Sequence, residues 1–115
     1  MTQTTDPLEA IKKSISEDIR TNKVVLYMKG NKSMPQCGFS AKVVHILDTL
    51  GCTYLDKNVL LDDTLRQGIK DFSQWPTVPQ LYIDGEFVGG CDIVTQLSES
   101  GQLQELLTSN IRDSL

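Results

Sequence analysis

Hydrophobic residues recur along the chain at two spacings, which distinguish the expected helices from the expected strands. Between residues 8 and 19 they return every three or four positions, directly after Asp6 and Pro7. That spacing is typical of an amphipathic helix, and aspartate followed by proline is typical of a helix start. Residues 24–28, in contrast, form an unbroken apolar run rich in valine, which favours a buried strand. The chain is therefore expected to begin with a helix followed by a buried strand.

The same rules predict the elements that follow. A loop is expected over 30–36, a helix over 39–50 ending at Gly51, a strand over 53–59, and a helix over 62–72 with a weak point at Gly68. Two strands, 80–83 and 86–88, are expected to form a hairpin around a tight Asp84-Gly85 turn. A helix then begins at Asp92, Gly101 interrupts it, and a last amphipathic helix runs from Leu103 to Ile111.

The order of these elements, α-β-α-β-α-β-β-α-α, defines the expected fold. Its first half contains a βαβ unit and its second half is a hairpin followed by helices. Connections of this kind predict an α/β protein with a central four-stranded mixed sheet flanked by helices. This is the thioredoxin-like arrangement.

Composition and charge narrow the classes of function. A length of 115 residues suits one domain spanning 1–115, with a short polar start, 1–6, that is expected to be flexible. The net charge of −4 argues against a nucleic-acid binder, which normally carries a basic face. No apolar run approaches the roughly 20 residues that cross a bilayer, and the start resembles neither a signal peptide nor an organellar presequence. We therefore expect no nucleic acid and no membrane among the partners.

The three cysteines indicate a reducing compartment. An odd number excludes a full disulfide framework, and free thiols suit the cytoplasm. The sequence leaves open a mature organellar form that begins near Thr2.

Cys37 lies where the loop over 30–36 passes into a helix. A thiolate there meets unpaired backbone N–H groups and the positive end of the helix dipole, which favour the nucleophilic, ionised form. The alternative is a buried, inert cysteine, but the position after the first core strand favours function. Three residues further on, Ser40 has a hydroxyl that cannot resolve a mixed disulfide. Thiol chemistry at Cys37 must therefore use an external thiol, Cys91 or a metal.

A metal bound by Cys37 could not be completed within one chain. His45 is eight residues further on, roughly 12 Å along the helix axis, and Cys52 lies beyond the end of that helix. A tetrahedral zinc site is therefore not expected. A [2Fe–2S] cluster typically needs four external ligands. Two chains with one Cys37 each would supply half of them, and two small thiols would complete the set.

Three other segments are expected to converge on Cys37 in this fold. They are Lys29 at the end of the first strand, the Thr77-Val78-Pro79 stretch, and the 89–92 stretch before a helix. If the Val78–Pro79 bond is cis, the backbone of Val78 stays free to pair with an extended peptide. The alternative is that the prolines of 76–79 merely end a helix and begin an edge strand.

Charged groups in these segments suit an anionic ligand. The backbone N–H groups of Cys91 and Asp92 at a helix start form an anion site, and the Asp92 carboxylate either caps that helix or accepts from a ligand ammonium. Lys29 and Arg66 are either solvated charges or a clamp on a second carboxylate. Glutathione matches this pocket with its two carboxylates, one ammonium, two amide links and a thiol, although the composition does not force that choice.

At these residues the chain closely resembles the monothiol glutaredoxins of the CGFS type. The similarity runs from about Leu8 to Leu107. The matching stretches, in order, are 27–30 (YMKG), 35–40 (PQCGFS), 75–80 (WPTVPQ) and 84–92 (DGEFVGGCD).

The resemblance implies a glutaredoxin domain that binds glutathione through Lys29, Arg66, Val78, Cys91 and Asp92. It also implies a homodimer bridged by a [2Fe–2S] cluster, whose ligands are Cys37 of each subunit and the thiols of two glutathiones. Such proteins act in iron–sulfur cluster transfer and biogenesis and in iron homeostasis, with BolA-like partners and acceptor apoproteins.

Three functions follow from the resemblance. The first is mainly a cluster carrier. The second is a glutathione-dependent oxidoreductase in which Cys37 removes glutathione from mixed disulfides, and weak activity of this kind is compatible with the first. The third is a regulatory adaptor that pairs with a BolA-like protein and reports iron status. The long loop over 31–36 could restrict the incoming thiol, which favours the carrier.

Overall fold

The apolar run at 24–28 is the central strand of the fold. In a computed structural model that describes residues 6–108, the sheet has the order β2-β1-β3-β4, in which β1 pairs parallel with β2 and antiparallel with β3. The predicted four-stranded mixed sheet flanked by helices is confirmed. The described elements are α1 (Pro7–Thr21), β1 (Val24–Met28), α2 (Gly38–Thr49), β2 (Leu55–Asn58), the short 3₁₀ helix η1 (Val59–Leu61), α3 (Asp63–Ser73), β3 (Gln80–Ile83), β4 (Glu86–Gly89), α4 (Cys91–Ser100) and α5 (Gln102–Thr108).

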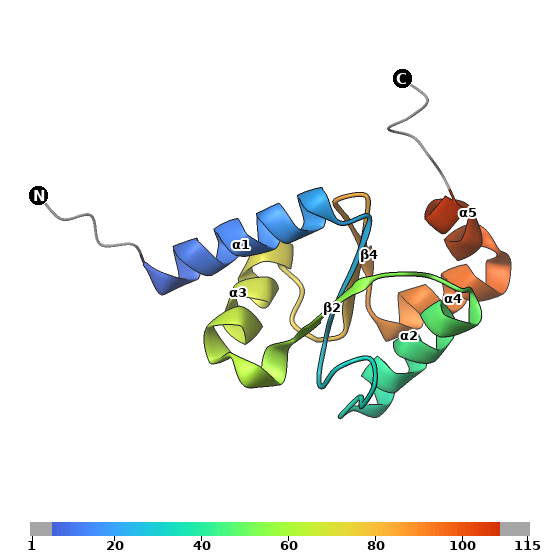
Figure 1. Cartoon of the computed structure of the whole chain (residues 1–115), viewed down its shortest axis with the longest axis horizontal. Coiled ribbons are helices and arrows are strands. Elements are labelled where there is room, and N and C mark those ends of the chain that lie inside the picture. Colours follow the sequence, from blue (N-terminus) through green and yellow to red (C-terminus); the bar gives the residue numbers. More distant parts are fainter. Residues whose placement is uncertain (1–5, 109–115) are drawn as a thin grey trace, which may run out of the picture.

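Two hydrophobic layers cover the two faces of the sheet. Alternate residues of β1 point to opposite faces, as its extended backbone requires. Leu26 packs in the layer formed with α2, α4 and α5, whereas Tyr27 packs in the layer formed with α1 and α3. Figure 1 shows α1 and α3 on one side of the sheet and α2, α4 and α5 on the other. Because both faces are covered, every residue of β1 is buried, which explains its unbroken apolar sequence.

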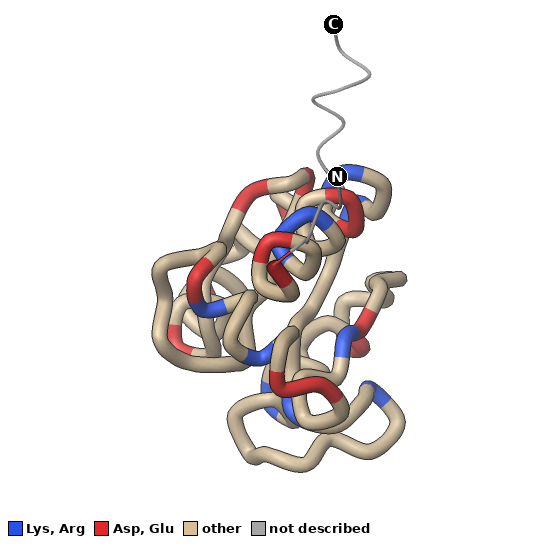
Figure 2. Tube along the Cα trace, turned by 90° about the vertical axis from the view of Figure 1, so that its left-hand side faces the viewer, with Lys and Arg blue, Asp and Glu red and all other residues tan. Residues whose placement is uncertain are grey.

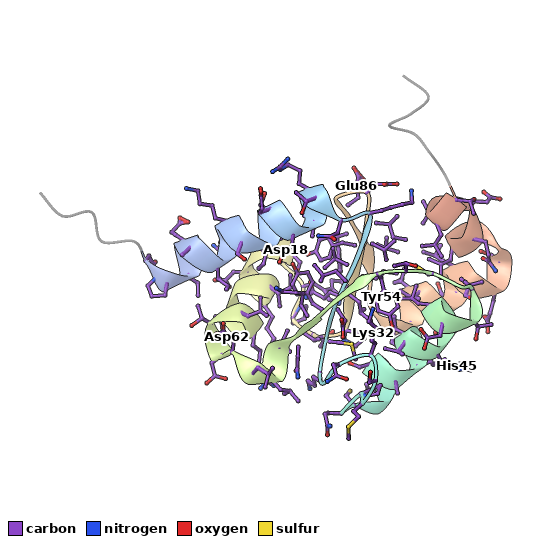
Figure 3. The ribbon with its side chains drawn as sticks, in the orientation of Figure 1. Asp18, Lys32, His45, Tyr54, Asp62 and Glu86 are labelled. Atoms are coloured by element: carbon purple, nitrogen blue, oxygen red, sulfur yellow. The ribbon has the colours of Figure 1, made fainter. Side chains whose placement is uncertain are left out.

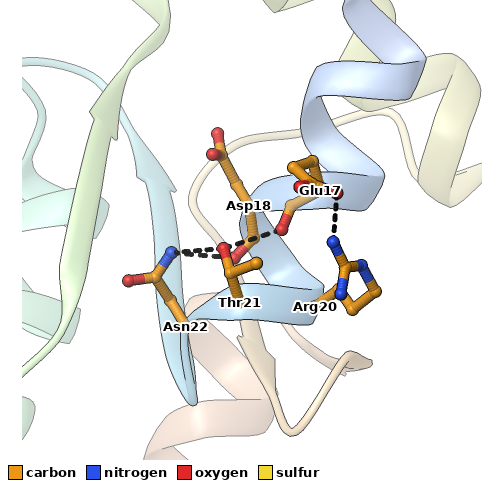
Figure 4. Close-up of polar contacts among 5 residues, drawn as sticks. All are labelled: Glu17, Asp18, Arg20, Thr21 and Asn22. Carbon is orange, nitrogen blue, oxygen red and sulfur yellow. Dashed lines mark hydrogen bonds and ion pairs between the residues drawn. The ribbon is translucent and has the colours of Figure 1, made fainter.

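Side chains define both ends of α1. The carboxylate of Asp6 accepts a hydrogen bond from the N–H of Leu8 at 3.1 Å, so Asp6 caps the helix as expected. At the other end, the Asn22 amide donates to the Asp18 carbonyl at 3.0 Å, and Arg20 pairs with Glu17 (Figure 4). Residues 1–5 of the expected flexible start lie outside the described residues, and so does Ile111.

The strand predicted over 53–59 is too long. The observed β2 is limited to Leu55–Asn58, and the chain then turns into η1. The cause is the Asn58 side chain, whose oxygen accepts from the N–H of Leu60 at 2.9 Å and starts this turn. The same oxygen accepts from the N–H of Gly30 at 3.0 Å, which ties η1 to the loop after β1.

The surface charge is mixed. On the side turned toward the viewer in Figure 2, which is the left-hand side of Figure 1, acidic and basic positions are interspersed along the trace. Over residues 6–108, no helix combines the length and the apolar character needed to cross a bilayer.

Candidate functional site

A pocket of about 450 Å³ opens beside the first turn of α2. Five segments line it: the end of β1, the start of α2, the middle of α3, the loop over 75–79, and the start of α4. The predicted site residues are all among those that line it: Lys29, Cys37, Arg66, Val78, Cys91 and Asp92. Their roles stay predictions, but the structure brings them together as the sequence requires.

Cys37 is the N-cap residue of α2 and is half-exposed in the pocket. The backbone N–H of Ser40 has the largest influence on its thiol and lowers its pKa below the ordinary value. The Phe39 N–H, the Lys29 ammonium and the Ser40 hydroxyl lower the pKa further, while partial desolvation acts in the opposite direction. These are the N–H groups that a helix start leaves without a partner, so the fold itself favours the thiolate.

The pKa of Cys37 predicts an order of reactivity. Burial raises the pKa of the Cys52 thiol, whereas that of Cys37 is lowered, so Cys37 forms its thiolate at lower pH. As the pH is raised stepwise, alkylation by iodoacetamide is expected to set in at Cys37 well before Cys52. Peptide mass spectrometry measures both inflections in one sample. The account of the thiolate is wrong if the Cys37 inflection lies at or above that of Cys52.

The loop between β1 and Cys37 is held against β2. Lys32 donates its backbone N–H to the Asp56 carboxylate and its ammonium to the Tyr54 carbonyl, each at 2.9 Å. The same ammonium lies 4.6 Å from the centre of the Tyr54 ring, and Figure 3 shows the two side chains side by side near β2. These contacts hold the residues that precede Cys37 in one place.

Ser40 links the end of β1, next to Lys29, to the first turn of α2, next to Cys37. Its side chain is completely buried, and its hydroxyl accepts from the backbone N–H of Lys29 at 3.1 Å. The end of β1 is thereby fixed to the first turn of α2. The sequence indicated only that Ser40 cannot resolve a mixed disulfide. The structure shows that its side chain also holds the end of β1 in place.

The loop over 75–79 forms a wall of the pocket. Of the two alternatives for the Val78–Pro79 bond, the structure has the cis form. The pairing of β3 with β1 ends at Gln80 opposite Tyr27, so Val78 lies beyond the ladder. The backbone of Val78 therefore lies at the pocket outside the sheet.

The start of α4 forms the neighbouring wall. Its N-cap is Gly90 and no side chain caps it, so the alternative in which Asp92 caps the helix is wrong. The helix begins at Cys91, one residue earlier than expected, which places the N–H groups of Cys91 and Asp92 in its first turn at the pocket. First-turn N–H groups have no acceptor within a helix, so both suit a carboxylate.

Three cations and one carboxylate line the pocket. Lys70 joins Lys29 and Arg66, and Asp92 is the carboxylate. Sequence reasoning missed Lys70, although its position four residues after Arg66 on one helix was a usable signal. The pocket therefore combines an excess of positive charge with a single acidic group.

Exposed apolar side chains lie in the Cys37 pocket and on the loop before it, and they were not predicted as part of the site. Phe39 is 64% exposed, Trp75 42% and Ile93 39%, and all three line the pocket. Met34, on the loop before Cys37, is 65% exposed. Burying this rim would need a ligand or a second protein surface.

The residues that could ligate a metal are sparse here. Within the described part of the chain, no three His, Cys, Asp or Glu side chains gather as a metal site. His45 lies on the exposed side of α2, as Figure 3 shows. At this pocket one chain offers a metal the thiols of Cys37 and Cys91, fewer than the four ligands of a [2Fe–2S] cluster, so a shared cluster fits better than a site enclosed by one chain.

Comparison of the sequence with known proteins identifies its relatives. The family described as "Glutaredoxin" matches residues 24–88. "Probable monothiol glutaredoxin 2" of Rickettsia typhi is 58% identical over 95 residues, covering 83% of this chain and 86% of the relative. "Monothiol glutaredoxin-S14, chloroplastic" of Arabidopsis thaliana is 50% identical over 95 residues, covering 83% of this chain and 55% of the relative.

Solved structures agree with these matches. The solution structure of reduced poplar apo GrxS14 has a TM-score of 0.77 at 50% identity and covers 87% of this chain and 93% of its own. The buckwheat glutaredoxin–glutathione complex has a TM-score of 0.81 at 25% identity, with 92% and 94% covered. The holo form of glutaredoxin C1 from Populus tremula x tremuloides has a TM-score of 0.79 at 25% identity, with 90% and 91% covered.

Proposed function

The chain belongs to the monothiol glutaredoxins, and from this premise we propose that it binds glutathione and, as a cluster-bridged homodimer, carries a [2Fe–2S] cluster to acceptor proteins. The observation that carries the proposal is the convergence of Cys37, the predicted glutathione contacts and an excess of positive charge in one pocket. The similar buckwheat structure is a complex with glutathione and supports glutathione binding. The similar structure of glutaredoxin C1 is a holo form and supports binding of a further group.

Each part of glutathione has a matching group in the pocket. The first-turn N–H groups of Cys91 and Asp92 suit one carboxylate, and the Asp92 carboxylate suits the neighbouring ammonium. The backbone of Val78 suits the amide links, and Lys29 and Arg66 suit the second carboxylate. Bound in this direction, the tripeptide would bring its thiol toward Cys37.

The cluster itself is cargo, and the donor count determines how the chain would hold it. One Cys37 from each of two copies and one thiol from each of two glutathiones complete the four ligands that a [2Fe–2S] cluster takes. The exposed rim of Met34 and Phe39 beside Cys37 suits the second copy, and it equally suits a BolA-like partner or an acceptor apoprotein.

Glutathione-dependent oxidoreduction is the second candidate function. The lowered pKa of Cys37 favours it, since a thiolate attacks mixed disulfides. Lys32 fixes the loop before Cys37 to β2, and a fixed loop that restricts the incoming thiol would favour the carrier. Turnover on a glutathionylated substrate without a cluster would support the oxidoreductase, whereas a cluster with little turnover would support the carrier.

We also propose a cytoplasmic site of action. The three cysteines are unpaired, which suits a reducing compartment. Of the relatives reported above, one is bacterial and the other is a plant protein whose name places it in the chloroplast.

Replacing Arg66 with alanine is expected to weaken glutathione binding. A charge-assisted hydrogen bond to the ligand carboxylate would be lost, at a cost of about 1–3 kcal/mol. Isothermal titration of the apoprotein with glutathione measures the change. Arg20→Ala is the matched control, because Arg20 pairs with Glu17 at the far end of α1 (Figure 4) and should leave the affinity unchanged. Equal affinities for both variants and the wild type would mean that Arg66 is a solvated charge.

A further inference from the structure

Gln80 is a completely buried amide directly behind the pocket. Apart from Ser40 and the hydroxyl-bearing tyrosines, it is the only buried polar residue among residues 6–108. Its Nε2 donates to the carbonyl of Trp75 at 3.2 Å and to that of Thr77 at 3.0 Å, and its Oε1 accepts from the Tyr82 hydroxyl at 3.4 Å. A buried amide with both ends bonded specifies the position of its partners more narrowly than apolar packing does.

The two carbonyls that Gln80 holds belong to the loop that lines the pocket. This loop, 75–79, lies outside the β1–β3 ladder, so strand pairing does not fix it. Both hydrogen bonds from Gln80 reach across to the loop from the first residue of β3. The Gln80 side chain therefore holds the loop over 75–79 at the edge of the pocket, where hydrogen bonds between β1 and β3 no longer do so.

The position of this loop also determines how close it lies to α4. A Cβ on Gly90 would lie 3.3 Å from the Pro79 carbonyl and 3.6 Å from Nε1 of Trp75, so the loop backbone and the indole pack against the N-cap of α4. The Trp75 ring is also 6.0 Å from the Phe87 ring of β4. A shift of the loop would move the wall of the carboxylate site as well as the backbone of Val78.

We propose that Gln80 is a positioning residue for the thiol peptide: its amide holds the loop over 75–79 so that Val78 and Trp75 line the pocket in a binding-ready arrangement. This inference rests on the proposed function, because the ligand it serves is glutathione. Gln80 itself does not line the pocket, so it acts through the loop and not by contact.

The test compares two substitutions on the same strand. Gln80→Met keeps the length of the side chain and removes both donors. Tyr82→Phe removes the hydroxyl that bonds Oε1 and Ser73, and it leaves both hydrogen bonds from Gln80 to the loop in place. Isothermal titration with glutathione is expected to show affinity about 5- to 50-fold weaker for Gln80→Met. For Tyr82→Phe the affinity should stay within about twofold of the wild type. Equal affinity for Gln80→Met and the wild type would overturn the inference.

A second readout follows the loop without any ligand. Trp75 is the only tryptophan in the chain, so its fluorescence reports this loop directly. Acrylamide should quench Trp75 more strongly in Gln80→Met than in the wild type or Tyr82→Phe, while the pH inflection of Cys37 alkylation stays unchanged. A merely structural role would move that inflection too, because general loosening would disturb the first turn of α2. Unchanged quenching in Gln80→Met would contradict the inference.

The wild-type chain gives an independent check if Gln80→Met does not fold. By NMR, the side-chain NH₂ protons of Gln80 should exchange slowly with solvent, and more slowly still with saturating glutathione. Fast exchange, or exchange that glutathione leaves unchanged, would overturn the inference. If the wild type binds no glutathione, the proposed function fails, and the quenching comparison still tests whether Gln80 holds the loop.

Discussion

Replacement of Cys37 with serine is expected to abolish cluster binding and the cluster-bridged dimer while leaving the fold intact. Cys37 supplies the only protein thiol that we assign to the cluster, and a hydroxyl is a poor ligand for it. The fold should survive because Cys37 is half-exposed, makes no side-chain cap hydrogen bond and belongs to neither hydrophobic layer. Visible absorption after anaerobic reconstitution measures the cluster, molar mass in solution measures the dimer, and circular dichroism measures the fold.

Cys52→Ser is the matched control for this substitution. Cys52 packs against the layer formed with α2, α4 and α5 and does not line the Cys37 pocket. We expect the Cys52→Ser protein to show the full visible absorption of the cluster and to remain a dimer. A Cys37→Ser protein that retains a fully occupied cluster would refute the ligand assignment.

Replacement of Gly30 with alanine is expected to lower the free energy of unfolding by roughly 2–4 kcal/mol. Gly30 has φ +86°, a conformation that side chains disfavour. A Cβ there would lie 2.5 Å from the Met34 carbonyl oxygen and 2.6 Å from the Gln36 backbone nitrogen. Because both neighbours are backbone atoms, the loop that leads into Cys37 would have to move. Urea unfolding measures the loss.

Gly38→Ala is the control on the other side of Cys37. Gly38 lies in the first turn of α2, and a Cβ there would meet no atom within 4 Å. Alanine should be neutral or stabilising by up to about 1 kcal/mol. If Gly30→Ala were as stable as Gly38→Ala, the loop before Cys37 would be looser than the structure indicates.

The central sheet could be predicted because local patterns and tertiary structure agree there. The apolar run at 24–28 is buried on both faces, and the Asp84-Gly85 turn joins β3 to β4 as expected. The end of β2 could not be predicted in the same way. β2 ends at Asn58, whose side-chain oxygen accepts a hydrogen bond from the N–H of Leu60 and starts η1. The same oxygen accepts from the N–H of Gly30, a residue that is distant in the sequence, and local patterns do not report such a contact.

Gly68 shows how packing can reverse a local interpretation. Within its own helix a glycine is unfavourable, so the sequence indicated a weak point in α3. In the structure Gly68 is buried where α1 crosses α3, and a Cβ would collide with the side chain of Ile11. The missing side chain permits the close approach of two helices, which no pattern within residues 62–72 could show.

The candidate site was predictable in membership and less so in detail. The segments that carry Cys37, Val78 and Asp92 follow from motif and topology, because each lies at the edge of a predicted element. The capping alternative for Asp92 failed because α4 begins one residue earlier, at Cys91. The positional role of Gln80 depends on contacts with a loop that has no regular structure, which propensities do not describe.

Reconstitution of the wild-type protein is the most direct test of the account. The purified apoprotein is given iron and sulfide without air, once with glutathione and once without it, and visible absorption and molar mass are recorded together. We expect a coloured dimer with glutathione and a colourless monomer without it. A colourless monomer in both samples, or an equally coloured dimer in both, would contradict the claim that glutathione completes the ligand set that Cys37 begins.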